Sequence, residues 1–416
     1  MKHSRLSPFG AALAGLFAVS AQAADMPSQA EMWRIIQQQQ REIEALRRDQ
    51  QSTEQKVEAT GEALDSLQGG TLTTAEPAPA ALGAAHGPFE HGGAGKTVVG
   101  GYGELHYNNL EQDGSNKKEI DFHRAILFLG HQFTDDIRFF SEVEYEHADT
   151  SKNGAVELEQ AWLEFDLNDR LSARAGLFLV PVGILNETHE PATFYGVERN
   201  PIEKNIIPTT WWVGGAGLKG EVAPGWSLDL AVHEGMDTSA ADNYAVRKGR
   251  QKTSEADASD LAATGRLKWS GLAGVELAAS VQYQQDMTQG QDPNAGNAWL
   301  YEAHADIRRG RLGLRALYAL WDLDGSGPAA VGADRQKGFY VEPSFKLTPK
   351  LGLFARYNQW DNRAGDSSDS QKKQYQAGIN YWPHPDVVLK LDLQNQDNED
   401  SSTEEKGFNL GVGYQF

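Results

Sequence analysis

The chain of 416 residues contains no cysteine. It therefore has no disulfide framework and no thiolate metal site, which suits export to an oxidising compartment without proving it. Beyond the N-terminus it also lacks any run of about 18 consecutive apolar residues, so the mature chain is not expected to cross a membrane as a helix. The structure must therefore be sought in shorter patterns.

Positive charge is also scarce. The chain has 38 Lys and Arg residues against 58 Asp and Glu residues, which makes the formal net charge −20 at pH 7. Nucleic-acid binding is not expected, because phosphate backbones demand clustered cations. The low mean hydropathy of −0.53 does not exclude a membrane protein, because a transmembrane β-barrel needs an apolar residue only at every second position.

The N-terminal residues match the pattern of a secretory signal. Lys2 and Arg5 precede an apolar run over residues 6–19, and Ala21-Gln22-Ala23 forms a small-residue cleavage site. We predict that residues 1–23 are a signal peptide. The alternative is an N-terminal anchor helix, for which the apolar run is too short.

A heptad repeat follows. Ile, Val and Leu recur every seven residues from Ile36 to Leu64, with Gln50 as the polar exception, in a stretch rich in Gln, Glu and Arg. We predict a coiled-coil segment over residues 24–68; the alternative is a solvated single helix. Residues 69–95 are rich in Gly, Ala and Pro and are predicted to form a flexible linker.

From Thr97 onward the apolar period changes to two, which is typical of half-buried strands. The last strand ends the chain with Val412, Tyr414 and Phe416 on one face. The sixteen predicted strands are 97–107, 119–133, 136–147, 156–167, 171–179, 213–223, 227–235, 260–270, 274–286, 299–308, 311–322, 337–347, 351–360, 372–382, 386–396 and 406–416.

The connections between these strands decide the fold. Those after even-numbered strands are tight, such as Asn168-Asp169-Arg170, whereas those after odd-numbered strands are longer and polar, such as 236–259 and 361–371. Short turns at one end, long loops at the other and an even strand count are typical of an outer-membrane barrel. We predict an all-β membrane protein in which residues 96–416 form a 16-stranded antiparallel transmembrane β-barrel, preceded by the short α-helical coiled coil.

Aromatic residues at strand ends support this prediction. Trp269, Tyr283, Tyr357 and Tyr381 stand near the ends of their predicted strands. Rings at these places form the two girdles that mark the membrane interfaces of such barrels.

The longest connection, residues 180–212, is too apolar for a solvated loop. We expect it to fold into the barrel and to narrow the pore, so that its charges act on passing solutes. The alternatives are that it caps the outer mouth or packs on a neighbouring subunit. Its charged and ionisable residues are Glu187, His189, Glu190, Glu198, Arg199, Glu203 and Lys204.

This loop also carries a family resemblance. It resembles bacterial outer-membrane porins of the phosphate-selective O/P type, as do the Asp121-Phe122-His123-Arg124 opening of the second strand and the N-terminal coiled coil. The resemblance implies a homotrimeric outer-membrane channel for small solutes. The runs that carry it are Gly183-Ile184-Leu185-Asn186-Glu187, Phe194-Tyr195-Gly196-Val197-Glu198-Arg199-Asn200-Pro201 and Pro208-Thr209-Thr210-Trp211-Trp212.

The predicted lumen wall departs from that family. Its characterised members line the lumen with rows of Arg and Lys, whereas this wall mixes both signs. One strand alone places Glu142, Glu144 and Glu146 on the lumen face. The wall residues that we expect to face the pore are Arg138, Glu142, Glu144, Glu146, Arg174, Lys219, Arg266, Lys268, Arg315 and Arg356.

Nothing in the sequence nominates an enzyme, a cofactor or a metal site. There is no Gly-x-Ser-x-Gly elbow and no His-Glu-x-x-His motif. The predicted lumen histidines, His106, His233 and His304, are isolated in sequence and are expected to be solvated polar residues.

The sequence therefore predicts a porin, a water-filled channel for passive, charge-tuned diffusion of small hydrophilic solutes and ions, including phosphate or other anions. Its expected location is the outer membrane of a Gram-negative bacterium, in contact with lipid, with the N-terminal segment in the periplasm. The alternative is an envelope tether whose barrel anchors a coiled coil bound to the cell wall; a secreted adhesin is a more distant one. The solute, the sign of ion selectivity and the oligomeric state of the coiled coil stay open.

Overall fold

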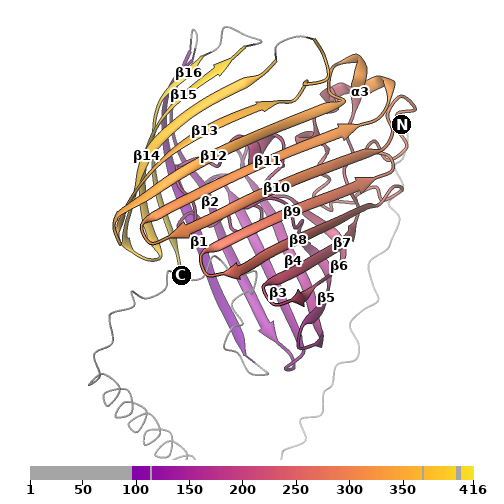
Figure 1. The fold of residues 1–416 in the computed structure, drawn as a ribbon, viewed down its shortest axis with the longest axis horizontal. Helices are drawn as coiled ribbons and strands as arrows, with labels where there is room; N and C mark the ends of the chain where they lie inside the picture. Colours follow the sequence, from indigo (N-terminus) through magenta and orange to yellow (C-terminus); the bar gives the residue numbers. More distant parts are fainter. Residues whose placement is uncertain (1–95, 113–114, 368–369, 400–403) are drawn as a thin grey trace, which may run out of the picture. The chain divides into compact units, whose positions relative to one another are not determined.

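In a computed structural model, residues 96–112, 115–367, 370–399 and 404–416 are described. They form a closed barrel of sixteen antiparallel strands, in which each strand pairs with its neighbours in sequence and β1 pairs with β16 (Figure 1). The predicted signal peptide, coiled coil and linker lie outside the described residues. The strands are β1 (Thr97–Gln112), β2 (Ser115–Gln132), β3 (Ile137–Glu146), β4 (Ala155–Asn168), β5 (Leu171–Leu179), β6 (Trp212–Ala223), β7 (Trp226–His233), β8 (Ala262–Leu272), β9 (Val275–Gln284), β10 (Ala298–Arg309), β11 (Leu312–Leu323), β12 (Arg335–Thr348), β13 (Leu351–Asp361), β14 (Lys372–His384), β15 (Val387–Asn398) and β16 (Glu405–Gln415).

All sixteen predicted strands are confirmed, and the barrel closes between the two ends of the described chain. Phe416 N donates to Gly101 O at 2.9 Å, and Gly101 N donates to Phe416 O at 3.1 Å. Closure leaves no unpaired sheet edge, as a bilayer requires of a strand-built protein. The main difference lies between β1 and β2, where both strands extend beyond the prediction and only residues 113–114 connect them.

The outer face of the barrel is apolar. On each strand, exposed apolar side chains alternate with polar side chains of the opposite row, as with Tyr145 (46% exposed) between Glu144 and Glu146. An apolar row toward lipid and a polar row toward an aqueous interior is the pattern predicted for this fold.

Two aromatic bands lie on this face. Tyr283 and Trp299, whose ring centroids are 4.6 Å apart, lie where β9 and β10 meet the long connections. Trp226 and Trp269 lie 6.4 Å apart at the opposite end, beside the tight turns. Their positions agree with the predicted interfacial girdles.

The two ends of the barrel differ. Tight turns gather at the end where β1 begins, and long connections that hold the short helix α3 (Ser326–Ala330) gather at the other (Figure 1). The other helices, α2 (Ile202–Asn205), η1 (Ala240–Asp242) and η2 (Val246–Gly249), also lie in long connections. In the described part of the chain, no helix is long and apolar enough to cross a membrane.

The lumen holds an apolar core built by the connections. Ile202, Ile206 and Ile207 of residues 180–211 (the inner loop) are fully buried with Trp321 and Tyr340 of the wall. The apolar side chains of the loop need an apolar surface to pack against, which a wall of polar residues alone would not offer. The rings of Trp321 and Tyr340 provide that surface.

A second connection, residues 234–261 (the second loop), also folds inward. We expected a polar connection here, but Met236, Tyr244 and Val246 are buried in the same core. The apolar residues of this stretch are widely spaced among polar ones, so no run in the sequence reveals them.

Candidate functional site: the inner loop and the acidic wall

The inner loop is closed at its neck by one buried side chain. Asn186 Nδ2 donates to the carbonyl oxygens of Val180 (2.8 Å) and Trp211 (3.1 Å), and Asn186 Oδ1 accepts from Trp211 N at 2.7 Å. The two ends of a long loop are thereby joined where they leave the wall.

A buried carboxylate organises the loop internally. Glu203 Oε1 accepts from the backbone nitrogens of Ile184 (2.7 Å) and Leu185 (2.6 Å). Its Oε2 accepts from Asn200 Nδ2 at 2.9 Å and from the Tyr340 hydroxyl at 3.1 Å. Although we expected Glu203 to face solutes, its carboxylate is fully buried and holds the loop together.

Wall arginines fasten the loop to the barrel. Arg124, Arg315 and Arg356 donate to loop carbonyl oxygens, those of His189 (2.6 Å), Thr193 (3.0 Å) and Tyr195 (2.6 Å) respectively. Two of these arginines were expected to line the pore; both act as clamps. Guanidinium groups suit this task because they carry several donors in a fixed plane.

The predicted loop charges take different positions. Glu187 forms an ion pair with Arg266 of β8. Glu198 accepts from His106 Nδ1 at 3.1 Å and from Asn108 Nδ2 at 3.2 Å on β1.

The remaining loop charges take no part in these two contacts of Glu187 and Glu198 with the wall. Arg199 donates to Thr210 Oγ1 at 2.9 Å, Lys204 is exposed, and Glu190 is half-buried. His189 is buried beside β4, with its Nε2 3.9 Å from Glu159 Oε2.

Burial and neighbouring charges shift the titration of these loop groups. Although burial favours its neutral form, Arg266 and Lys268 hold the pKa of Glu187 at about 2. Burial, reinforced by Arg199, lowers the pKa of His189 well below its ordinary value, so the ring is neutral at pH 7. Burial raises the pKa of Glu190.

The cations of the wall are largely neutralised by carboxylates on neighbouring strands. Every wall cation that we predicted lies on the lumen row. Because each is paired with a carboxylate, these cations do not form a row of unpaired positive charges along which anions could pass. The nitrogen–oxygen distances are 2.7 Å for Arg138–Glu164, 2.8 Å for Arg174–Glu164, 3.7 Å for Lys219–Glu164, 2.9 Å for Arg266–Asp229, 3.6 Å for Lys268–Glu276, 2.8 Å for Arg315–Asp306 and 2.7 Å for Arg356–Glu342.

Three carboxylates of β3, Glu142, Glu144 and Glu146 (the acidic row), are different. In the described part of the chain, none has a Lys or Arg nitrogen within the ion-pair distance of 4.0 Å. Charges of opposite sign act on Glu144 and Glu146 from further away: Arg250 of the second loop interacts electrostatically with both.

Three arginines form a cationic group on the two loops: Arg199, Arg247 and Arg250 (the arginine cluster). Burial, and then the charges of Arg250 and Arg199, lower the pKa of Arg247 to about 10. Arg247 and Arg250 are held by the loop carbonyl oxygens of Lys204 and Thr210. Cations on the loops therefore oppose carboxylates on the wall.

The family model described as phosphate-selective porin O and P matches residues 98–416, which is nearly the whole described barrel. The chain belongs to this porin family. Like other barrels of this kind, this porin forms a water-filled channel through the outer membrane for passive diffusion of small hydrophilic solutes.

One curated protein and two solved structures are also similar to this porin. An uncharacterised protein of Aquifex aeolicus (strain VF5) is 32% identical over 344 residues, which are 73% of this chain and 76% of that protein. The outer membrane channel DcaP of Acinetobacter baumannii has 16% identity and a TM-score of 0.56, over 78% of this chain and 98% of the other. An anion-selective porin from Comamonas acidovorans has 12% identity and a TM-score of 0.55, over 77% and 100%. The two structures share the fold.

Sequence reasoning missed several residues of this porin's site. Arg247 and Arg250 lie in a connection that gave no sign of turning inward, and the predicted solvated ring of His106 is buried between Glu104 and Glu198. Glu159 was also missed, although a signal existed.

That signal is a break in the alternation of β4. The outward apolar row runs through Val156 and Leu158, then changes parity and continues through Leu163 and Phe165. Such a change marks an inserted residue between them.

Proposed function

We propose that this porin sorts small charged solutes in an electric field between the acidic row of β3 and the arginine cluster of the loops. The observation that supports this is that these two groups oppose each other without direct ion pairs, while the seven wall cations named above are paired with carboxylates. Fixed charges across a constriction act on a solute within about one Debye length, roughly 8 Å at physiological salt. The field therefore acts where the loops narrow the lumen.

Phosphate selectivity is not part of this proposal. An anion ladder needs unengaged cations along the wall, and here Arg315 and Arg356 are engaged by carboxylates and loop carbonyls. The anion selectivity named for the Comamonas porin is therefore not carried over to this chain. We propose that selectivity between ions is modest and is set by the balance of the two opposed groups.

Reversal potentials in a planar bilayer under a KCl gradient test the proposal. Glu144→Gln should shift the reversal potential toward anion preference, and Arg250→Gln should shift it toward cation preference. Glu221→Gln, at a tight turn, is the matched control and should leave it unchanged. Equal reversal potentials for all four proteins would refute the proposed field, without affecting the identification of a channel.

We further propose that no covalent chemistry is involved and that the porin is a homotrimer with its N-terminal segment in the periplasm. The heptads over residues 24–68 support oligomerisation. Thr97 pairs with His131, next to the tight turn between β2 and β3, so the chain enters the barrel at the tight-turn end. In outer-membrane barrels that end faces the periplasm.

The envelope tether stays a second candidate because of the heptads. Deletion of residues 24–95 separates the two functions: a porin keeps its conductance, and a tether loses attachment of the outer membrane to the cell wall. Both results together would show that one chain has both roles.

A further inference from the structure

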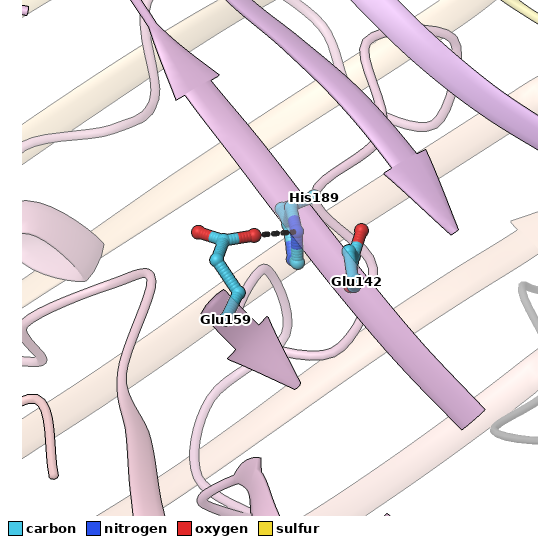
Figure 2. A group of neighbouring side chains, drawn as sticks. All are labelled: Glu142, Glu159 and His189. Carbon is cyan, nitrogen blue, oxygen red and sulfur yellow. Dashed lines mark ion pairs between the residues drawn. The ribbon is translucent and has the colours of Figure 1, made fainter. Parts of the chain in front are cut away.

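Three buried side chains from separate segments meet where the inner loop touches the wall. They are Glu142 of β3, Glu159 of β4 and His189 of the loop, which are 4%, 0% and 3% exposed (Figure 2). One ligand atom of each lies within 4.8 Å of the other two. Glu190, three residues before the loop threonine that Arg315 clamps, is not one of these three ligands, although its charge acts on Glu142.

A β-bulge places Glu159 in the group. In the pairing of β3 with β4, Glu142 is opposite Gln160 and Val143 is opposite Leu158, so that Glu159 has no partner residue. The extra residue directs an additional carboxylate into the lumen beside Gln160. Bulges frequently re-aim side chains next to functional sites.

Among the residues that the structure describes, neither oxygen of the Glu159 carboxylate has a hydrogen-bond partner. A buried and unpaired carboxylate costs several kcal/mol. Three nearby guanidiniums act on this carboxylate, but each donates its hydrogen bonds elsewhere. Arg124 donates to Glu104 at 2.6 Å, Arg199 donates to Thr210 Oγ1 at 2.9 Å, and Arg250 donates to the carbonyl oxygen of Thr210.

Further carboxylates, those of Glu142 and Glu144, also act on Glu159. They make it less favourable still to leave this position without a cation.

His189 presents a free lone pair to the same point. Its Nδ1 lies 3.0 Å from the carbonyl oxygen of Asn186, to which it can only donate, so Nε2 carries the lone pair. Nε2 has no hydrogen-bond partner in the described part of the chain and is 3.9 Å from Glu159 Oε2, too far for a hydrogen bond. Metal-ligating histidines are oriented in this way, by donation of the other ring N–H to a carbonyl or carboxylate.

We propose that Glu142, Glu159 and His189 bind one divalent transition-metal ion of the Zn²⁺ class. An imidazole nitrogen with two carboxylate oxygens favours such ions over Mg²⁺ or Ca²⁺, which prefer oxygen ligands alone. Ligand distances near 2.0–2.2 Å place the ligand atoms of one ion about 3–4 Å apart. Ligand atoms that are up to 4.8 Å apart therefore need to approach one another by at most about 1–2 Å.

The site goes beyond the proposed charge sorting and does not depend on it. A bound ion would join the inner loop to β3 and β4 through His189, where the ring now approaches these strands through the 3.9 Å contact of its Nε2 with Glu159 (Figure 2). It would also neutralise Glu142, a member of the acidic row. Zn²⁺ should therefore shift the reversal potential toward anion preference. Binding itself is measured first and separately.

The test is Zn²⁺ binding to the full-length folded protein after treatment with a chelator. Equilibrium dialysis followed by elemental analysis should find one ion per chain. Glu159→Gln and His189→Gln should each weaken binding at least about ten-fold. Glu146→Gln, which removes a carboxylate from the same strand, is the matched control and should bind like the wild type.

Three results would overturn the proposal. One is equal Zn²⁺ binding by wild type and Glu159→Gln; the second is loss of binding in His123→Gln, which would place the ion at the stacked His106–His123 pair, whose ring centroids are 4.7 Å apart. The third is absence of Zn²⁺ binding by the wild type, which would leave protons and the nearby arginines to balance the buried carboxylates. If His189→Gln fails to fold, the absorption spectrum of Co²⁺ bound to the wild type still reports whether a nitrogen ligand is present.

Discussion

At the scale of single residues, most charges in this lumen act on the protein itself. Glu203 and the arginines Arg124, Arg315 and Arg356 hold loop backbone groups that would otherwise lack partners. A charged side chain in the lumen is therefore not by itself evidence of a contact with solute. The groups left to act on solutes are those that form no ion pair of opposite charge in the described part of the chain: the acidic row of β3 and the arginine cluster of the loops.

The first prediction concerns Glu203. Glu203→Gln should destabilise the inner loop by about 2–4 kcal/mol, because the backbone N–H groups exchange a charged acceptor for a neutral one and an amide NH2 replaces the oxygen that accepts from Asn200 and Tyr340. The barrel should persist, since its strand hydrogen bonds do not involve this residue. The measurement is protease cleavage within residues 180–211 together with open-channel current noise. Unchanged cleavage and noise would contradict the role given to Glu203.

A second prediction concerns pH. Burial opposes charge on Glu198, but the hydrogen bond and charge of His106 lower the pKa of Glu198 well below its ordinary value. Because the folded pKa is depressed, the stabilisation is complete above the unfolded pKa, about 4.3, and is lost as pH falls toward the folded pKa.

Glu198→Gln isolates this contribution, because His106, His123 and Lys204 act on the same carboxylate in the wild type. We expect the difference in loop protease resistance between wild type and variant to be constant from pH 7 to about 5 and to shrink below about 4. A difference that shrinks already above pH 5 would contradict the depressed pKa.

At the scale of elements, the register of a strand determines which charged residues face the lumen, and apolar packing against the wall determines where a loop lies. The bulge in β4 moves Glu159 into the lumen. The inner loop lies against β11 through Trp321, whose Nε1 donates to Ile206 O at 3.0 Å. The polar contacts position the loop, while the buried isoleucines supply most of the apolar burial that holds it.

The third prediction tests that seat. Ile206→Ala should cost about 2–5 kcal/mol of loop stability, because it leaves a cavity in a closely packed core. Ile120→Ala, on the outer face and 72% exposed, is the control and should cost little. Hydrogen exchange of the inner-loop amides measures the difference, and equal protection in the two variants would show that the loop does not depend on this packing.

At the scale of the whole molecule, the barrel separates two solvents. Its outer row is apolar around the full circumference, while its inner face carries charges, most of them paired, and holds two inward loops. The same sixteen-stranded barrel is compatible with other lumen side chains, because the backbone hydrogen bonds between strands do not depend on the identity of the inward-facing residues.

The fourth prediction concerns the outer face. Leu391→Arg, at the middle of β15, should reduce the free energy of unfolding from a bilayer by about 2–4 kcal/mol. Leu312→Arg, beside a tight turn, should reduce it by at most about 1 kcal/mol, because the cation reaches the interface. Denaturant unfolding in lipid vesicles, followed by tryptophan fluorescence, gives both values; a larger loss at Leu312 would contradict the assigned membrane depth.

The sequence by itself determined the strands, their number, the two kinds of connection and the aromatic bands. These follow from local patterns, because each strand meets lipid on one face and water on the other whatever its neighbours are. It also nominated the inner loop, whose apolar content is unusual for a connection. The change of parity in the apolar row of β4 was a local signal that Glu159 faces the lumen, but the strand prediction did not use it.

Only the tertiary structure decided which charges oppose one another. Closure of the barrel brings Arg356 to the carbonyl oxygen of Tyr195, 161 residues away in sequence, and sets Arg250 of the second loop opposite the acidic row. It likewise brings His189 of the inner loop to Glu142 and Glu159 of the wall. Such contacts cross the lumen between segments that share no local pattern, so the physical reason for them exists only once the sheet has closed on itself.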